Sequence, residues 1–160
     1  MRNFDGFYKG IDLGGWISQC GKNYNDEHYS TFITEKDIEK IASMGLDHVR
    51  MPVDYNVIQT EDGKLIESGM TYIDNCVNWC KKHGLNIVID LHKTCGYIFD
   101  DPTYCGFFAN EKLQDQFVYL WQEIAKRYGN DEHIAFELLN EITSADFTEP
   151  WNKIASRTEI

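Results

Sequence analysis

Two short segments of the sequence place a carboxylic acid close to an amide or an imidazole, and such pairs can carry out acid–base chemistry. Asn140 directly precedes Glu141, and His92 stands two residues after Asp90. A carboxylic acid can protonate the oxygen that departs when a glycosidic bond breaks, and a neighbouring amide can hold the sugar 2-hydroxyl. The alternative for Asn140 and Glu141 is the start of a helix, where Asn caps the helix and Glu faces its dipole.

Arg50 and His92 each lie at the end of a β-branched, apolar run of the sequence. Buried polar groups are costly unless they are paired, so such side chains at strand ends are candidates for a polar site. Each also has a structural alternative. His92 can be a buried histidine that bonds a backbone carbonyl, and Arg50 can form a salt bridge with Asp90 or Asp54.

The aromatic residues fall in two settings, helices and loops. Trp79 and Trp121 lie in predicted helices, where packing is the expected role, whereas Trp16 follows a predicted strand and can stack on a sugar ring. The loop 93–110 carries five Tyr and Phe residues, among them Tyr97, together with two glycines. This loop is expected to be either a cleft wall that binds sugar rings, with Tyr97 as a contact, or a lid packed on the domain.

The elements that must position these residues recur as strand, loop and amphipathic helix. Four β-branched runs predict strands, at Lys9 to Leu13, Asp47 to Met51, Asn86 to Leu91 and Ile134 to Leu138. Helices are predicted from Thr34 to Gly45, from Met70 to His83, from Glu111 to Tyr128 and from about Pro150. Such alternation indicates parallel strands whose carboxyl ends meet at one edge, within one domain over residues 1–160. Periodicity alone leaves open a doubly wound sheet or an eight-fold barrel.

Composition excludes several classes of partner. The formal charge of −11, without a run of Lys or Arg, disfavours nucleic acid and anionic membranes. No apolar stretch reaches the roughly 20 residues of a membrane span, and residues 1–10 lack a signal-peptide core. Five cysteines and no glycosylation sequon favour a cytoplasmic location. Cys76 and Cys80 are expected to pack in a helix face, so no metal is predicted, and no cofactor motif is present.

Four segments together resemble glycoside hydrolase family 5, the cellulase family, and are most similar to clostridial-type endoglucanases. These segments are Gly10 to Trp16, His48 to Pro52, Asn86 to His92 and Ala135 to Glu141. The resemblance implies an α/β fold of the TIM (β/α)8 type and a retaining endo-β-1,4-glucanase. It implies Glu141 as acid/base, Asn140 as the 2-hydroxyl contact, Arg50 as support for the nucleophile and His92 as a sugar-binding residue. A second His often follows His92 in the family, but Lys93 stands there in this sequence.

Length sets a further expectation, because a barrel of this type needs about 250 residues. The 160 residues therefore predict half a barrel, four βα units with parallel strands, without the nucleophilic Glu expected after strand seven. Such a chain is expected to be inactive alone and to associate with itself or with the missing half barrel. The expected ligand is a β-linked oligosaccharide or polysaccharide. The alternatives are a β-1,3-glucanase, mannanase or xyloglucanase, a non-catalytic carbohydrate-binding half barrel, or a complete doubly wound domain.

Overall fold

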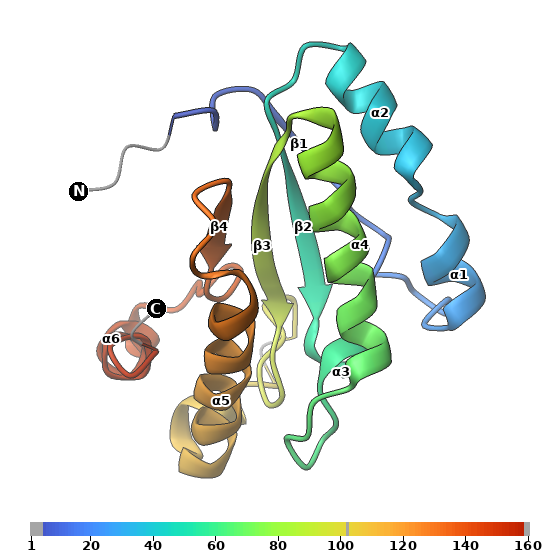
Figure 1. Cartoon of the computed structure of the whole chain (residues 1–160). Coiled ribbons are helices and arrows are strands. Elements are labelled where there is room, and N and C mark those ends of the chain that lie inside the picture. The colour runs from blue at the N-terminus through green and yellow to red at the C-terminus, as the bar shows by residue number, and fades with distance from the viewer. Residues whose placement is uncertain (1–4, 102, 159–160) are drawn as a thin grey trace.

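The computed structural model describes residues 5–101 and 103–158 and contains one sheet of parallel strands (Figure 1). Residues 1–4, 102 and 159–160, which belong to the predicted domain and to the predicted aromatic loop, lie outside the described residues. The strands are β1 (Gly10–Asp12), β2 (His48–Asp54), β3 (Asn86–Lys93) and β4 (Ile134–Glu137). Their spatial order is β1-β2-β3-β4, the order of the sequence, so the sheet lacks the reversal that defines a doubly wound fold. The prediction of a barrel segment is confirmed.

Helices follow the strands as the sequence predicts, with short additions. The α-helices are α1 (Asp26–Thr31), α2 (Glu35–Ser43), α3 (Tyr55–Ile58), α4 (Glu67–His83), α5 (Glu111–Tyr128) and α6 (Thr148–Ala155), and the 3-10 turns are η1 (Gly106–Ala109) and η2 (Ala145–Phe147). At the start of α2, the backbone N–H of Thr34 donates to Asp37 at 2.8 Å, and the two residues form a capping box. The sequence did not predict α1 and α3, because helices of six and four residues are too short to show a period.

Strand β2 is longer than its pattern predicts. It continues through Pro52 to Asp54, whereas the sequence indicated an end near Arg50. Proline has no N–H to give to a ladder, yet Pro52 is tolerated because β1 ends at Asp12, opposite Arg50. Arg50 therefore lies inside β2, and Asp54 is the last residue of this strand.

The two faces of the sheet differ in their cover. Helices α2, α4 and α5 lie on one side of the sheet in Figure 1. The strand residues on that face are almost fully buried, as Val49, Met51, Ile87 and Ile89 show with exposed fractions of 0 to 2%. The opposite face carries residues such as Arg50 and is only partly buried. This face corresponds to the interior of a closed barrel.

The close approach of α3 and α4 depends on the absence of a side chain at Gly69. A Cβ atom built at Gly69 would lie 1.9 Å from the carbonyl oxygen of Val57 and 2.8 Å from its carbonyl carbon. Because the obstacle is backbone, it cannot move aside as a flexible side chain would.

We predict that Gly69→Ala destabilises the protein by about 2 kcal/mol, because the steric overlap exceeds the roughly 1 kcal/mol that Ala gains in a helix. Urea unfolding measures the difference. Gly106→Ala is the matched control, because no atom lies within 4 Å of a Cβ at Gly106. Equal stability of Gly69→Ala and wild type would contradict this account of the α3–α4 packing.

Candidate active site

The guanidinium of Arg50 joins all four strands on the uncovered face of the sheet. Its Nε and Nη2 atoms donate to the two carboxylate oxygens of Glu137 in β4, each at 2.8 Å. Its Nη1 donates to Asp12 in β1 at 3.0 Å, and its Nη2 lies 2.8 Å from Asp90 in β3 and 2.9 Å from Asn140 Oδ1. The hydrogen bonds with Glu137 are the main reason that the pKa of Arg50 is raised above its ordinary value. The predicted salt bridge to Asp90 is thus confirmed, and that to Asp54 is wrong.

Asp90 connects Arg50 to His92. Its carboxylate has an exposed fraction of 0%, and burial raises the pKa of Asp90 while His92 and Arg50 act in the opposite direction. The Nδ1 atom of His92 lies 2.7 Å from Asp90 Oδ2. An ionised carboxylate only accepts hydrogen bonds, so Nδ1 donates to Asp90, and in the corresponding neutral tautomer Nε2 is an acceptor. His92 is buried, as its structural alternative required, but its partner is a carboxylate and not a backbone carbonyl.

Three buried polar atoms in this network lack partners among the described residues. One is Asp90 Oδ1, which belongs to the carboxylate that Arg50 and His92 already bind through Oδ2. The other two are Asn140 Nδ2 and His92 Nε2. Arg50 can only donate, so Asn140 Oδ1 must face it and the amide N–H groups of Asn140 remain free. Leaving such a group unpaired costs about 1–3 kcal/mol. A ligand that carries hydroxyl groups can satisfy both atoms, since a hydroxyl accepts from an amide and donates to an imidazole.

Glu141 follows Asn140 at the carboxyl end of β4. The backbone N–H of Asn140 donates to the carbonyl of Leu91 in β3 at 3.2 Å, which places Asn140 beside the segment that holds His92. The side chain of Glu141 is exposed, and its carboxylate has no hydrogen bond or ion pair within the described part of the chain. The next helical turn begins only at Ala145, so the helix-cap alternative for Asn140 is wrong.

Tyr97 is buried and contacts the backbone next to the site. Its exposed fraction is 4%, and its hydroxyl donates to the carbonyl oxygen of Glu141 at 2.6 Å. Its ring is packed among other aromatic rings, and its predicted contact with a sugar ring stays a prediction. The loop 93–110 is accordingly packed on the domain at this position. Phe99, which the sequence did not single out, contacts the ring of His92 edge-on at 5.4 Å.

Trp16 is part of the core. Its exposed fraction is 1%, its Nε1 donates to the carbonyl of Tyr29 at 2.7 Å, and its ring stacks on Trp79 at 6.2 Å. The ring of Trp16 is therefore buried, and its predicted stacking on a sugar stays a prediction. The predicted packing role of Trp79 is confirmed.

Asp54 forms a second polar cluster at the carboxyl end of β2. Its carboxylate, with an exposed fraction of 1%, accepts from Ser18 Oγ at 2.7 Å, from the N–H of Gln19 at 3.1 Å and from the Tyr24 hydroxyl. Lys93 Nζ lies 3.3 Å from the same carboxylate. The sequence missed this cluster because β2 was expected to end earlier. Lys93 thus neutralises a buried acid, a role that its place after His92 alone did not reveal.

Residues 5–101 and 103–158 contain neither a metal-binding cluster of acidic, His and Cys side chains nor a helix that could cross a membrane. No group of three or more His, Cys, Asp or Glu residues there is arranged to hold a metal ion. Cys76 and Cys80 have exposed fractions of 0% and 1%, which confirms their predicted packing in a helix face. None of the described helices is long and apolar enough to span a bilayer.

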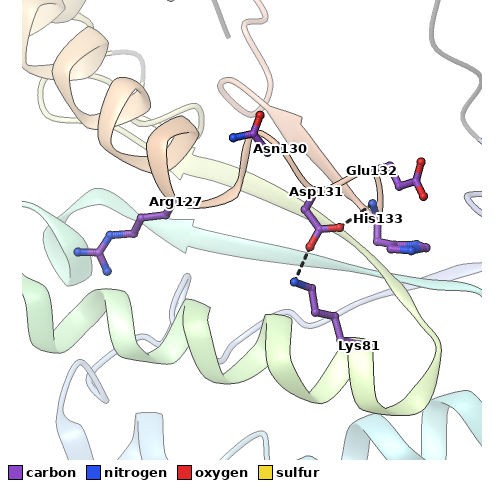
Figure 2. A pocket seen from close by; sticks show the side chains of 6 residues that line it. All are labelled: Lys81, Arg127, Asn130, Asp131, Glu132 and His133. Atoms are coloured by element: carbon purple, nitrogen blue, oxygen red, sulfur yellow. Dashed lines mark hydrogen bonds and ion pairs between the residues drawn. The ribbon is translucent and has the colours of Figure 1, made fainter.

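An open hollow of about 480 Å³ lies at the other end of the sheet, where α5 leads into β4 (Figure 2). It is lined by Lys81, Arg127, Asn130, Asp131, Glu132 and His133. Figure 2 shows Asp131 between Lys81 and the backbone of His133, and the Lys81–Asp131 ion pair measures 2.6 Å. The charges of Lys81, Asp131 and Arg127 already have partners within the protein, and the hollow lies away from the carboxyl ends of the strands. The hollow is therefore separate from the candidate active site.

A half barrel with polar residues at the carboxyl ends of its strands is typical of a class of α/β enzymes that includes glycoside hydrolases. Comparison with known proteins identifies the family. The family described as "Cellulase (glycosyl hydrolase family 5)" matches residues 12–159. The chain belongs to this family, which confirms the resemblance seen in the sequence. It is 52% identical to cellodextrinase A of Ruminococcus flavefaciens over 94% of this chain and 45% of the relative. It is 51% identical to endoglucanase C of Acetivibrio thermocellus over 92% of this chain and 43% of the relative.

Solved structures agree in fold. The endoglucanase Cel5A of the hyperthermophile Thermotoga maritima superposes with a TM-score of 0.74 at 24% identity, over 96% of this chain and 46% of that one. A glycoside hydrolase superposes with a TM-score of 0.77 at 23% identity, over 94% of this chain and 47% of that one. The chain therefore spans a little under half the length of the curated relatives that it matches.

The ion pair in Figure 2 predicts a pH-dependent contribution to stability. Burial raises the pKa of Asp131, but the hydrogen bonds from Lys81 and the His133 N–H outweigh it and hold the pKa below its ordinary value. The ionised form is thus favoured in the folded state. The contribution is present above the unfolded pKa of about 4 and is lost as the pH falls through the folded value.

We predict that Asp131→Asn lowers the free energy of unfolding by about 0.5–1 kcal/mol at neutral pH, and that the difference from wild type shrinks below about pH 4. Urea unfolding of both proteins, from neutral pH to below about pH 4, measures this difference in the free energy of unfolding. Glu132→Gln is the control, since Glu132 is exposed in the same loop. A difference for Asp131→Asn that stays constant into acid would show that the charge of Asp131 is not its cause.

Proposed function

We propose that the protein carrying this chain is a retaining glycoside hydrolase that cleaves internal β-1,4 bonds of glucan, with Glu141 as general acid/base. The observation that carries the proposal is the pair of buried, unpartnered atoms Asn140 Nδ2 and His92 Nε2, at the carboxyl ends of neighbouring strands, with Glu141 following Asn140 in the chain. The identity of 51–52% to a cellodextrinase and an endoglucanase supports glucan as the substrate.

Each residue has a distinct task in this mechanism. Asn140 donates a hydrogen bond to the sugar 2-hydroxyl, and the bond strengthens as the oxocarbenium-like transition state forms. His92 accepts a hydrogen bond from a second hydroxyl and so fixes the orientation of the ring. Glu141 gives a proton to the departing oxygen and, in the second step, takes a proton from the attacking water. Arg50 does not touch the sugar in this scheme but holds Asn140 and, through Asp90, His92.

A retaining mechanism needs a second carboxylate about 5 to 5.5 Å from the acid. Glu137 is a poor candidate because both of its oxygens are bound by Arg50, and Asp90 is fully buried. We place the nucleophile in the portion of a family barrel that this chain does not match, since the relatives are about twice as long. On this basis the 160-residue chain by itself has at most trace activity on aryl β-cellobiosides.

Two rivals differ from this proposal in different ways. A β-1,3-glucanase, mannanase or xyloglucanase would use the same residues on another polymer, and rates on the four polymers separate these substrates. A non-catalytic carbohydrate-binding half barrel is compatible with the unpartnered atoms of Asn140 and His92. It predicts binding of cello-oligosaccharides without hydrolysis by the whole protein.

We predict that Glu141→Gln lowers kcat of the whole protein on cello-oligosaccharides by about a hundredfold to ten-thousandfold, because the proton donor is lost. Binding of cello-oligosaccharides, measured by calorimetry, should stay almost unchanged. Glu149→Gln is a matched control, since Glu149 is an exposed acid that forms an ion pair with Lys153 in the same helix. Full activity of Glu141→Gln would refute the role of Glu141.

The edges of the sheet lead to a prediction about association. Within the described residues, β1 pairs only with β2 and β4 pairs only with β3, so each has one unpaired edge. Open edges and an uncovered sheet face favour pairing with another chain. We predict that the 160-residue chain alone forms dimers or larger species, and that a polypeptide with the complementary half barrel binds it instead. Size-exclusion chromatography with light scattering tests this, and a compact, cooperatively melting monomer would contradict it.

A further inference from the structure

We propose that Tyr97 is a positioning residue for Glu141: its hydroxyl holds the Glu141 carbonyl and so fixes the direction from which the carboxyl approaches the leaving oxygen. This inference rests on the proposed function and extends it to a residue of a different loop. Tyr97 does not touch the sugar in this scheme. It acts only through the backbone of Glu141.

The backbone at Glu141 is in a conformation that its surroundings must maintain. Its φ angle is 47°, in the left-handed region that residues other than glycine rarely adopt. Such a conformation is strained for an L-residue, because it brings Cβ close to the following carbonyl oxygen. Among the described residues, Gln19 is the other non-glycine with positive φ. Because Glu141 is strained and is the proposed proton donor, we expect specific restraints on both of its sides.

Those restraints are present on both sides of Glu141. On the preceding side, the Asn140 N–H is bonded to Leu91 and the Asn140 side chain to Arg50. On the following side, the Tyr97 hydroxyl bonds the Glu141 carbonyl at 2.6 Å. The two peptide groups that flank a residue determine its φ and ψ angles and hence the direction of its Cα–Cβ bond. Loss of the Tyr97 hydrogen bond releases the second peptide group.

Tyr97 is itself fixed by aromatic packing. Its ring meets Phe108 edge-on at 5.2 Å and Phe147 edge-on at 6.4 Å, and Phe108 and Phe147 stack at 4.1 Å with an interplanar angle of 9°. Phe147 belongs to η2, six residues after Glu141. We call Tyr97, Phe108 and Phe147 the aromatic clamp. The aromatic clamp joins the loop after β3 to the segment after β4, so the hydroxyl of Tyr97 has a defined place relative to Glu141.

The protonation state of Tyr97 suits this role. Burial raises the pKa of Tyr97 above its ordinary value, so the hydroxyl keeps its proton and remains a donor at the pH values at which a glycosidase works. The hydrogen bond to the Glu141 carbonyl is therefore constant over the range in which catalysis is measured. Tyr97 itself contributes no titration to the pH profile.

The test compares leaving groups in the whole protein. A misplaced general acid slows cleavage of a substrate whose leaving group needs a proton, such as methylumbelliferyl β-cellobioside, but hardly affects a dinitrophenyl β-cellobioside, whose acidic phenol departs without one. We expect Tyr97→Phe to lower kcat/KM about tenfold or more on the first substrate and less than about twofold on the second. Tyr128→Phe is the matched control, because it removes another buried hydroxyl with a 2.6 Å bond to a group outside the site, Asp74.

Equal losses on both substrates, or no loss on either, would overturn the positioning role. If Tyr97→Phe does not fold, Phe147→Leu loosens the aromatic clamp while keeping the hydroxyl. It should show the same dependence on the leaving group with a smaller loss, and a uniform loss would overturn the proposal. Glu141→Gln on the same two substrates tests the proposed function separately, because an unchanged rate on methylumbelliferyl β-cellobioside removes Glu141 as the acid whatever Tyr97 does.

Discussion

The cation of Arg50 is the constraint on which the polar face of the sheet depends. Carboxylates from β1, β3 and β4 and the amide of Asn140 gather around one guanidinium. Without a positive charge, these acids would repel one another on a face that a barrel encloses. The planar guanidinium also imposes directions, because each of its three nitrogen atoms donates to a defined acceptor. The orientation of the Asn140 amide, and through Asp90 that of the His92 ring, follows from this geometry.

The candidate site is therefore held by two systems of different chemistry. Charged hydrogen bonds fix the residues inside the strands, whereas aromatic packing fixes the loops that follow β3 and β4. Glu141 lies where the two systems meet, with Asn140 tied to the first and Tyr97 to the second. This division suits a site that needs rigid binding atoms and an acid open to the substrate.

The sequence predicted the elements well where the signal was local. The period of α5 and the β-branched run of β3 are visible over many residues, and four motifs together indicated the family. Prediction from the sequence failed where the role of a residue depends on a partner far away in the chain. The burial of Trp16 depends on a hydrogen bond to the carbonyl of Tyr29, which lies in a helix too short to predict. The end of β2 was missed because the strand can contain Pro52 only where β1 has already ended. Tyr97 was chosen as an aromatic loop residue, but its hydrogen bond to Glu141 spans 44 positions, and no local pattern encodes such a partner.

The stack of Phe108 on Phe147 bears on how relatives of this chain can be recombined. The two rings come from loops on either side of α5, so a chimaera with its crossover in that helix would combine rings from different parents. Tyr97 would then pack edge-on against two rings that come from different parents and that did not evolve together. Crossovers before Lys93 or after Phe147 keep these rings in one inherited block. The loops after β3 and β4 are consequently one exchangeable module, although the sequence separates them by a complete helix and strand.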